Sequence, residues 1–226
     1  MDIVKNAWEV KDDRHALLAL AGNHTAEEFA SNRQLRAKEV ADFCAIGPLK
    51  RGFEIGSGEG TVARLISPQC QSLDCNDISQ SFLDMAKNNC AACANVRFHL
   101  IGAEYLSHLA SASYDFGYSL NVFIHFNPYD IFNYLQEVKR LLKPGGLFYF
   151  DACTLGDQTM PLFCEQARDY RITPQQVRGY LNFNDPAVIC RIVLEAGLEV
   201  SDKSQFSTGG WLKVLVTRTA PPIGSR

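Results

Sequence analysis

The chain has 226 residues, 46% of them hydrophobic and 21% charged, which is typical of a globular protein with one large domain, or a core domain with a small cap. The net charge of −3 and basic clusters no longer than Lys50-Arg51 argue against a nucleic-acid partner. No run of about 18 apolar residues and no basic-then-apolar leader is present, so the sequence predicts a cytoplasmic protein with no membrane segment.

The eight cysteines bear on redox state and on metal binding. In a chain without a secretory leader, we expect reduced thiols that pack as small hydrophobic side chains. Cys90-Ala-Ala-Cys93 has the spacing of a metal-ligand pair, but no second Cys or His pair at finger-like spacing accompanies it. The sequence therefore predicts no metal site.

Residues 1–50 are predicted to form a helical cap. Asp13–Leu20 is a short apolar-faced segment, and Thr25-Ala-Glu-Glu28 has the capping-box pattern that opens a helix, here one running to about Ile46. Arg33 falls on the buried stripe of that helix. A buried arginine needs an anionic partner, unless its stem covers apolar surface while its head reaches water.

A strand, a glycine-rich turn and a helix follow in residues 52–66. Gly56, Gly58 and Gly60 allow the main chain to turn sharply and to approach a ligand, because no Cβ intervenes. The N–H groups at the start of the next helix suit a polar, nucleotide-like ligand. A dinucleotide fingerprint would place its third glycine at position 61, which is Thr61.

Two further strands are predicted beyond this turn, at Ser72–Asn76 and Val96–Ile101. Ser79 is the expected N-cap of the helix between them. Asp77 follows the first of these strands, where an acidic side chain can accept hydrogen bonds from ribose hydroxyls; the alternative is a simple loop or capping residue. His99 and His108 are expected to be strand or surface residues.

The second half of the chain continues the alternation of strands and helices. We predict a strand at Tyr114–Ser119, then a helix at 128–142 with Asn127 as N-cap and Pro128 in the first turn. Lys143-Pro-Gly-Gly146 is typical of a type II turn, and Leu147–Phe150 of a hydrophobic strand. A helix at Pro186–Ala196 and two strands forming a hairpin, at Leu198–Phe206 and Trp211–Arg218, complete the prediction.

Four of these features, in this order, resemble the class I S-adenosylmethionine-dependent methyltransferases. They are Glu54-x-Gly56-x-Gly58-x-Gly60, Asp77, the helix–Lys-Pro-Gly-Gly–strand unit and the final hairpin. The N-terminal pattern, with Trp8 and Glu27-Glu-Phe29, is loosely similar to bacterial small-molecule methyltransferases. The resemblance implies an α/β Rossmann-like three-layer sandwich. Its seven-stranded, mostly parallel sheet would have the order 3-2-1-4-5-7-6 and an antiparallel last strand.

The resemblance also divides the chain into four segments. Residues 153–185 are too long for an ordinary connection and are expected to form a helical lid over the substrate. The segments are the helical cap 1–50, the S-adenosylmethionine-binding core 51–152, the lid 153–185, and the final helix and hairpin 186–226.

The family carries over a set of cofactor-binding roles to this sequence. The glycine motif would shape the methionine side of the pocket, Asp77 would hold the ribose, and Ile78 would pack on adenine. In the family, an acidic residue usually lies near the adenine amine, and that position aligns with Gly102 here. Adenine would therefore be bound by main-chain groups around Ala103 and by the side chain of Glu104. The expected S-adenosyl-L-methionine-binding residues are Arg33, Glu54, Gly56, Ser57, Gly58, Gly60, Asp77, Ile78, Ala103, Glu104, Ser119 and Asn121.

The candidate reaction site follows the fourth strand, because ligands bind at the carboxyl ends of strands in such sheets. His125 is the candidate general base, since a histidine titrates near neutral pH; the alternative is that it only packs. Five aromatic residues are candidate walls of the substrate pocket, or plain core residues: Tyr118, Phe123, Phe163, Tyr170 and Trp211.

The function implied is methyl transfer from S-adenosylmethionine to an oxygen or nitrogen of a small-molecule acceptor. A catalytically silent cofactor-binding partner subunit is an alternative that only turnover can distinguish. A nicotinamide-dependent oxidoreductase is disfavoured by Thr61 and the final hairpin. A methylase of macromolecules is disfavoured by the predicted lid and the acidic net charge. The acceptor and the oligomeric state are left open.

Overall fold

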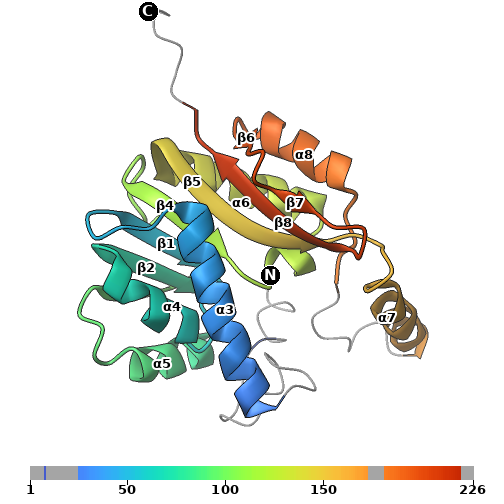
Figure 1. Cartoon of the computed structure of the whole chain (residues 1–226), viewed down its shortest axis with the longest axis horizontal. Helices are drawn as coiled ribbons and strands as arrows, with labels where there is room; N and C mark the ends of the chain where they lie inside the picture. Colours follow the sequence, from blue (N-terminus) through green and yellow to red (C-terminus); the bar gives the residue numbers. More distant parts are fainter. Residues whose placement is uncertain (1–7, 9–24, 173–180, 220–226) are drawn as a thin grey trace, which may run out of the picture. The chain divides into compact units, whose positions relative to one another are not determined.

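The computed structural model describes Trp8, residues 25–172 and residues 181–219. These described residues form a sheet of eight strands in the order β3-β2-β1-β4-β5-β8-β6, with β7 paired to β8 (Figure 1). The predicted Rossmann-like class and strand order are thereby confirmed, with β8 in the place of the predicted seventh strand. The chain separates into two compact units, residues 1–108 with 116–118, and residues 109–115 with 119–226.

The first unit contains the glycine turn and a parallel arrangement of strands. Strand β1 (Arg51–Ile55) pairs with β2 (Ser72–Asp77) and with residues 116–118 of β4 (Tyr114–Ser119), and β2 pairs with β3 (Val96–Leu100). The β1 and β2 side chains are almost all buried, as the short apolar run in β1 predicts. Strand β2 has a polar composition that is unusual for a buried strand. Its hydrogen-bonded pairing with β1 on one edge and β3 on the other explains why it is a strand.

From residue 25 on, the first unit contains the helices α3 (Ala26–Cys44), α4 (Thr61–Ile66) and α5 (Gln80–Asn89), in blue and green in Figure 1. Helix α3 begins with the predicted capping box, in which Glu28 N donates to Thr25 Oγ1 at 3.2 Å and Thr25 N donates to Glu28 Oε2 at 2.8 Å. Ser79 caps α5 as predicted, because its hydroxyl accepts from Phe82 N at 3.2 Å. The apolar segment Asp13–Leu20 lies outside the described residues.

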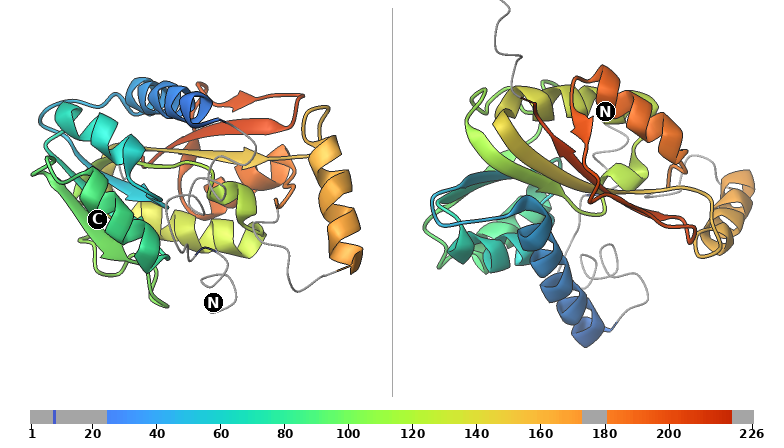
Figure 2. Two further views of the ribbon diagram at one scale, coloured as in Figure 1. Left: turned by 90° about the horizontal axis from the view of Figure 1, so that it is seen from below. Right: turned by 45° about the horizontal axis from the view of Figure 1, so that its top comes forward.

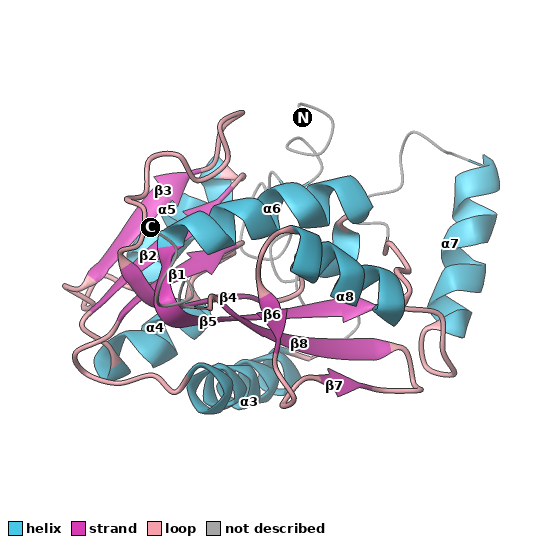
Figure 3. Cartoon of the chain, turned by 90° about the horizontal axis from the view of Figure 1, so that it is seen from above, coloured by secondary structure: helices cyan, strands magenta, loops and turns pink. Residues whose placement is uncertain are grey.

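The second unit is built on the antiparallel pair β5 (Leu142–Cys153) and β8 (Trp211–Thr217). Figure 3 shows α6 (Pro128–Leu141) and α8 (Pro186–Glu195) side by side over these strands. Asn127 caps α6 as predicted, with its side-chain oxygen accepting from Tyr129 N and Asp130 N at 2.9 and 3.1 Å.

Two strand boundaries in the second unit differ from the prediction. Strand β5 begins at Leu142, before the predicted turn, because Gly145 N and Gly146 O both pair with Arg218. Gly145 still has the positive φ of 81° expected at the third position of that turn. The first hairpin strand is divided into β6 (Glu199–Val200) and β7 (Gln205–Phe206), since Leu215 N between them donates to the Ser204 hydroxyl and not to a main-chain carbonyl.

Helix α7 (Met160–Ile172) occupies the predicted lid segment, of which residues 173–180 lie outside the described part. Both views in Figure 2 show α7 at the end of the β5–β8 pair. None of its residues with a described side chain is fully buried, and Phe163 contacts Phe183 edge to face at 5.5 Å. The lid role itself stays a prediction.

Candidate functional site

The glycine turn between β1 and α4 has the backbone conformation that requires glycine. Gly56, Gly58 and Gly60 have φ values of 77°, 51° and 81°, in the left-handed region. Gly56 N and Ser57 N both donate to Asn76 O, at 2.7 and 3.2 Å, which fixes the turn against β2. A Cβ on Gly60 would lie 2.8 Å from the Ala86 Cβ, so the turn also lies close against α5.

Asp77 lies directly beside this turn. Its Oδ2 accepts from Gly58 N at 2.8 Å and its Oδ1 accepts from Ser79 N at 2.9 Å. The carboxylate therefore joins the glycine turn to the start of α5, which supports the capping alternative. These two bonds fix the carboxylate in place beside the glycine turn.

Glu54 is buried in the middle of three neighbouring strands. Its register partners are Cys75 on β2 and Tyr118 on β4, so the three side chains share one face of the sheet. Burial raises the pKa of Glu54 to about 8, although Cys75 and Tyr118 beside it act in the opposite direction. Burial also raises the pKa values of Cys75 and Tyr118 well above their ordinary values.

Polar atoms around this face have no hydrogen-bond partner within the described part of the chain. They are Glu54 Oε2, Ser57 Oγ, Glu59 Oε1 and the Tyr118 hydroxyl. Tyr118 and Glu54 are close enough to shift each other's pKa, so these two polar groups lie together on this face. Buried polar groups normally find partners, so this set indicates a place for a polar ligand or water.

The opposite face of β2 carries a second polar network that supports the turn. Asp74 accepts a bidentate bond from Arg97 at 2.8 Å and a contact with His99 Nε2 at 2.8 Å. His108 Nε2 lies 2.8 Å from the Asn76 Oδ1, and the Asn76 amide donates to Glu54 O at 2.9 Å. Both histidines thus have structural partners, in agreement with the interpretation that they are not catalytic.

The remaining predicted cofactor residues of the first unit are more dispersed. Ile78 is partly exposed beside Asp77, while Ala103 and Glu104 lie in the exposed loop after β3. Arg33 is 7% exposed, with its guanidinium 4.5 Å from the centre of the Phe29 ring, as its place on the buried stripe predicts.

In the second unit, β4 leads into a short loop and a 3-10 turn, η2 (Phe123–His125). Ser119 is fully buried at the strand end. Asn121 has a φ of 57°, and its main-chain N–H donates to Asp151 Oδ1 at 2.7 Å. This charge-assisted bond holds the loop against the carboxyl end of β5, and Asp151 itself is only 7% exposed.

The main chain around His125 is held by residues 182–184. Asn182 N donates to Ile124 O at 2.8 Å, and its side-chain amide donates to His125 O at 2.6 Å. The Asn184 amide donates to Phe126 O at 3.0 Å. Three consecutive carbonyl groups are therefore satisfied by one short segment, which fixes the main chain that carries the partly exposed His125.

The candidate wall residues of the second unit have different environments. Phe123 is fully buried among Phe126, Tyr134, Phe148 and Phe150, with ring centroids 4.6–6.1 Å apart, so its position favours the core alternative. Phe163, Tyr170 and Trp211 are exposed, at 40%, 60% and 37%. Their exposure is compatible with a contact to a substrate, and that role stays a prediction.

Residues 53–150 match a family model described as a methyltransferase domain. This part of the chain is therefore similar to a methyltransferase domain. This matched part contains the glycine turn, Asp77, the loop after β4 and most of β5. The comparison with curated proteins finds no match.

Three solved structures with the same fold are described as methyltransferases. A geranyl diphosphate C-methyltransferase from Streptomyces coelicolor has a TM-score of 0.67 and 13% identity, over 96% of this chain and 97% of that one. A phosphoethanolamine N-methyltransferase from Haemonchus contortus has a TM-score of 0.70 and 18% identity, over 97% and 60%. A Haloferax volcanii protein, described as a methyltransferase in complex with the Trm112 methyltransferase activator, has a TM-score of 0.67 and 16% identity, over 94% and 100%.

Several residues that hold the loops of the candidate site were not predicted from the sequence. Asp151 directly follows the hydrophobic run Leu147–Phe150. An acidic residue at the end of a predicted strand indicates a binding or loop-holding side chain, so the sequence did contain a signal for it. Asn182 and Asn184 carry no such signal, because their partners lie 57 and 58 residues away in sequence. The pairing of Cys75 with Glu54 required the strand register, which composition does not supply.

No helix in the ranges 25–172 and 181–219 is long and apolar enough to cross a membrane. Within the same ranges, no group of three or more His, Cys, Asp and Glu side chains is arranged to hold a metal ion.

Proposed function

We propose that this chain transfers a methyl group from S-adenosyl-L-methionine to an oxygen or nitrogen atom of a small-molecule acceptor. The observation that carries the proposal is the set of buried, unsatisfied polar atoms next to the glycine turn, Glu54 Oε2 and Ser57 Oγ among them within the described residues. They lie beside a main chain that has no Cβ at three positions. This donor and acceptor set fits the polar amino-acid end of the cofactor.

The first unit supplies the groups that would hold the cofactor. Glu54 would accept a hydrogen bond from its ammonium group, and the main chain of Gly56–Gly60 would hold its amino-acid portion. Asp77 lies at the end of β2 beside the turn, where its carboxylate would accept hydrogen bonds from the ribose hydroxyls. When bound, S-adenosyl-L-methionine supplies a methyl group activated by the sulfonium.

The second unit supplies the groups that would act on the acceptor. His125 removes the proton from the acceptor hydroxyl or amine, for which an imidazole is suited near neutral pH. Asn182 keeps the His125 main chain in place through the 2.6 Å bond to its carbonyl. A small acceptor is supported by the names of two structural neighbours, which act on geranyl diphosphate and phosphoethanolamine.

Isothermal titration with S-adenosylhomocysteine, with NAD as control ligand, tests the cofactor assignment. We expect micromolar binding of S-adenosylhomocysteine, weakened about tenfold or more by Asp77→Ala and less by Asp77→Asn, which keeps one side-chain oxygen. Asp84→Asn, an exposed carboxylate on α5, is the matched control and is expected to bind like wild type. Binding of NAD without S-adenosylhomocysteine would contradict the proposal.

Turnover separates an enzyme from a silent cofactor-binding subunit. The chain is incubated with S-adenosyl-L-methionine and a panel of small alcohols, phenols and amines, and S-adenosylhomocysteine production is measured. We expect at least one acceptor to be methylated and His125→Gln to lower kcat about 10²-fold or more, the usual contribution of a general base. Cofactor binding without turnover on any acceptor, with a functional partner enzyme stimulated instead, would favour the silent subunit.

A further inference from the structure

Cys90 and Cys93 form a close pair of thiols for which the proposed methyl transfer has no use. Cys90 is the C-cap of α5, and Cys93 N donates to Cys90 O at 2.8 Å, which closes a β-turn over residues 90–93. The first and fourth Cα atoms of such a turn lie within about 7 Å. Since disulfides join Cα atoms about 4.4–6.8 Å apart, this main chain brings the two cysteines to bridging distance.

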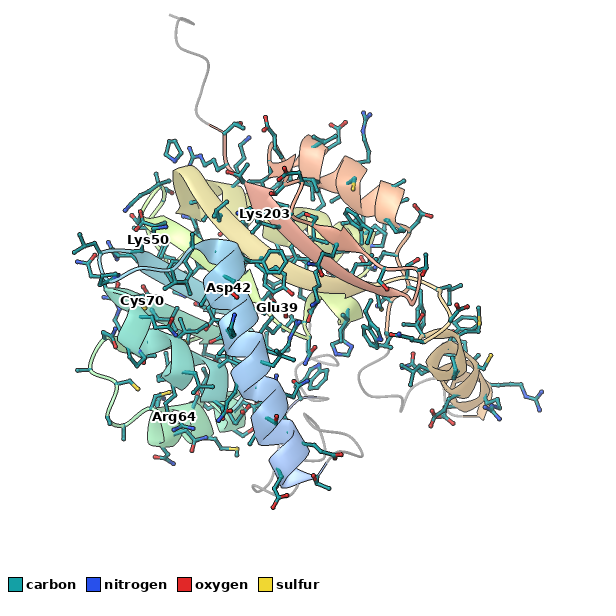
Figure 4. All side chains as sticks on the ribbon, in the orientation of Figure 1. Glu39, Asp42, Lys50, Arg64, Cys70 and Lys203 are labelled. Carbon is teal, nitrogen blue, oxygen red and sulfur yellow. The ribbon has the colours of Figure 1, made fainter. Side chains whose placement is uncertain are left out.

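The two thiols differ in access and in chemistry. Cys90 is 4% exposed, whereas Cys93 is partly exposed and can be reached by a small molecule. Burial raises the pKa of Cys90 to about 12; the Cys93 thiol beside it adds to the shift, and Arg64 on α4 opposes it (Figure 4). In redox motifs with a low thiol pKa, the thiolate stabilises the reduced form over the disulfide. Burial prevents this stabilisation of Cys90, so the disulfide form of this pair is relatively more stable.

The same cysteine is bonded to the glycine turn. Cys90 Sγ donates to Gly60 O at 3.4 Å, and the neighbouring Asn89 amide donates to Glu59 O at 2.8 Å. Ala86, one helical turn before Cys90, is the residue that leaves no room for a Cβ on Gly60. A disulfide removes the S–H donor of Cys90 and draws its sulfur toward Cys93, so the bond to Gly60 O is lost.

We propose that Cys90 and Cys93 are a redox-active dithiol, oxidised by a small disulfide such as glutathione disulfide, and that this oxidation loosens the glycine turn. The Cys93 thiolate attacks one glutathione sulfur, forming a mixed disulfide and releasing one glutathione, which takes up a proton. Cys90 then loses its proton and attacks the Cys93 sulfur, which releases the second glutathione. Two protein thiols are oxidised and one glutathione disulfide is reduced to two thiols. The inference does not depend on the proposed methyl transfer.

Peptide mapping of the full-length chain tests disulfide formation. Cleavage after Lys87 and Arg97 leaves both cysteines on one peptide, residues 88–97. After treatment with glutathione disulfide and alkylation of free thiols, we expect this peptide to be unalkylated and about 2 Da lighter than its dithiol form. In Cys90→Ser, which keeps a hydroxyl donor for Gly60 O, the second step is blocked and Cys93 is expected to retain glutathione. Cys164→Ser removes an exposed thiol elsewhere and is expected to behave like wild type.

Hydrogen exchange of residues 56–66 tests the effect on the turn. No cofactor is present, so failure here is separate from failure of the proposed function. We expect exchange several-fold faster in the oxidised chain than in the reduced chain, with the reduced rate restored by dithiothreitol. In peptide mapping, three results would overturn the proposal: peptide 88–97 stays reduced while Cys164 is modified, wild type keeps a stable glutathione adduct, or Cys90 pairs with Cys75. In hydrogen exchange, equal rates for residues 56–66 in the oxidised and reduced chains would also overturn it.

Discussion

Glu54 is a carboxyl group in surroundings that favour its neutral form. Burial raises its pKa from 4.5 to about 8, and it lies between two other groups, Cys75 and Tyr118, that also resist ionisation. In the unfolded chain the carboxyl ionises above about pH 4.5, whereas in the folded chain it stays protonated to about pH 8. Between those values the folded state binds more protons, so its stability decreases as pH rises.

Glu54→Gln removes this pH-dependent cost. We expect the free energy of unfolding of the variant to fall less steeply with pH between about 5 and 8, by up to about 1.4 kcal/mol per pH unit, because one proton is no longer linked to folding. Urea denaturation at several pH values measures the two slopes. Asp84→Asn removes an exposed carboxyl and should keep the wild-type slope; equal slopes for wild type and Glu54→Gln would show that Glu54 titrates normally.

Gly60 is constrained both by its backbone and by its neighbour. With a φ of 81° and Ala86 Cβ at 2.8 Å from an added Cβ, Gly60→Ala combines backbone strain with overpacking. We expect it to destabilise the chain by about 2–4 kcal/mol. Gly102→Ala, at an open position with no positive φ, is the matched control and should cost less than about 1 kcal/mol.

Ala86→Gly distinguishes the two causes at Gly60. If the close contact contributes, the double variant Gly60→Ala/Ala86→Gly will be more stable than the sum of the two single changes predicts, by about 0.5 kcal/mol or more. Chemical denaturation of the four proteins gives this coupling energy. Strict additivity would assign the whole effect to the left-handed backbone.

The segment 182–184 holds the 3-10 turn η2 in position within the second unit. Its bonds to the carbonyl groups of residues 124–126 keep η2 and His125 in a defined place, and Leu181 N donates to Gln166 on α7 at 3.1 Å. We infer that these bonds order the main chain that carries His125 within the second unit. Asn182 then acts through position, without taking part in the chemistry.

Asn182→Asp replaces the amide donor by a carboxylate oxygen opposite His125 O. An unsatisfied carbonyl and a repulsive contact should cost about 1–3 kcal/mol and speed hydrogen exchange in residues 122–127. Asn32→Asp, an exposed position on α3, is the matched control and should leave that exchange unchanged. The same exchange rate in Asn182→Asp and wild type would mean that the segment does not hold this loop.

Element types were predicted best where local chemistry decides them. Thr25 with Glu28, Ser79 and Asn127 are caps whose partners lie within three residues, and all three begin helices as expected. The start of β5 and the division of β6 from β7 depend instead on distant pairing with Arg218 and Leu215. Local turn chemistry at Lys143–Gly146 could not reveal a strand that its partner imposes.

At the scale of the whole molecule, motif order was sufficient to predict the sheet. The glycine turn, Asp77 and the unit before Leu147 follow one another as in the class, and strand order follows from that sequence of elements. The candidate site was predicted less completely. Glycine positions are visible in the sequence, but the burial of Glu54 and the carbonyl contacts of Asn182 arise only when residues far apart in sequence meet.

Ligand-dependent hydrogen exchange over the whole chain tests where the cofactor binds. The unsatisfied buried atoms identified near the glycine turn lie in residues 54–59 and at Tyr118, and all belong to the first unit. We therefore expect S-adenosylhomocysteine to slow exchange most in residues 54–66 and around Asp77, by more than tenfold at saturation, because binding satisfies those groups and stabilises the closed turn. Strand β8 and helix α8, which carry none of these atoms, should change least. Protection confined to the second unit would show that the glycine turn is a structural feature and that the ligand is held elsewhere.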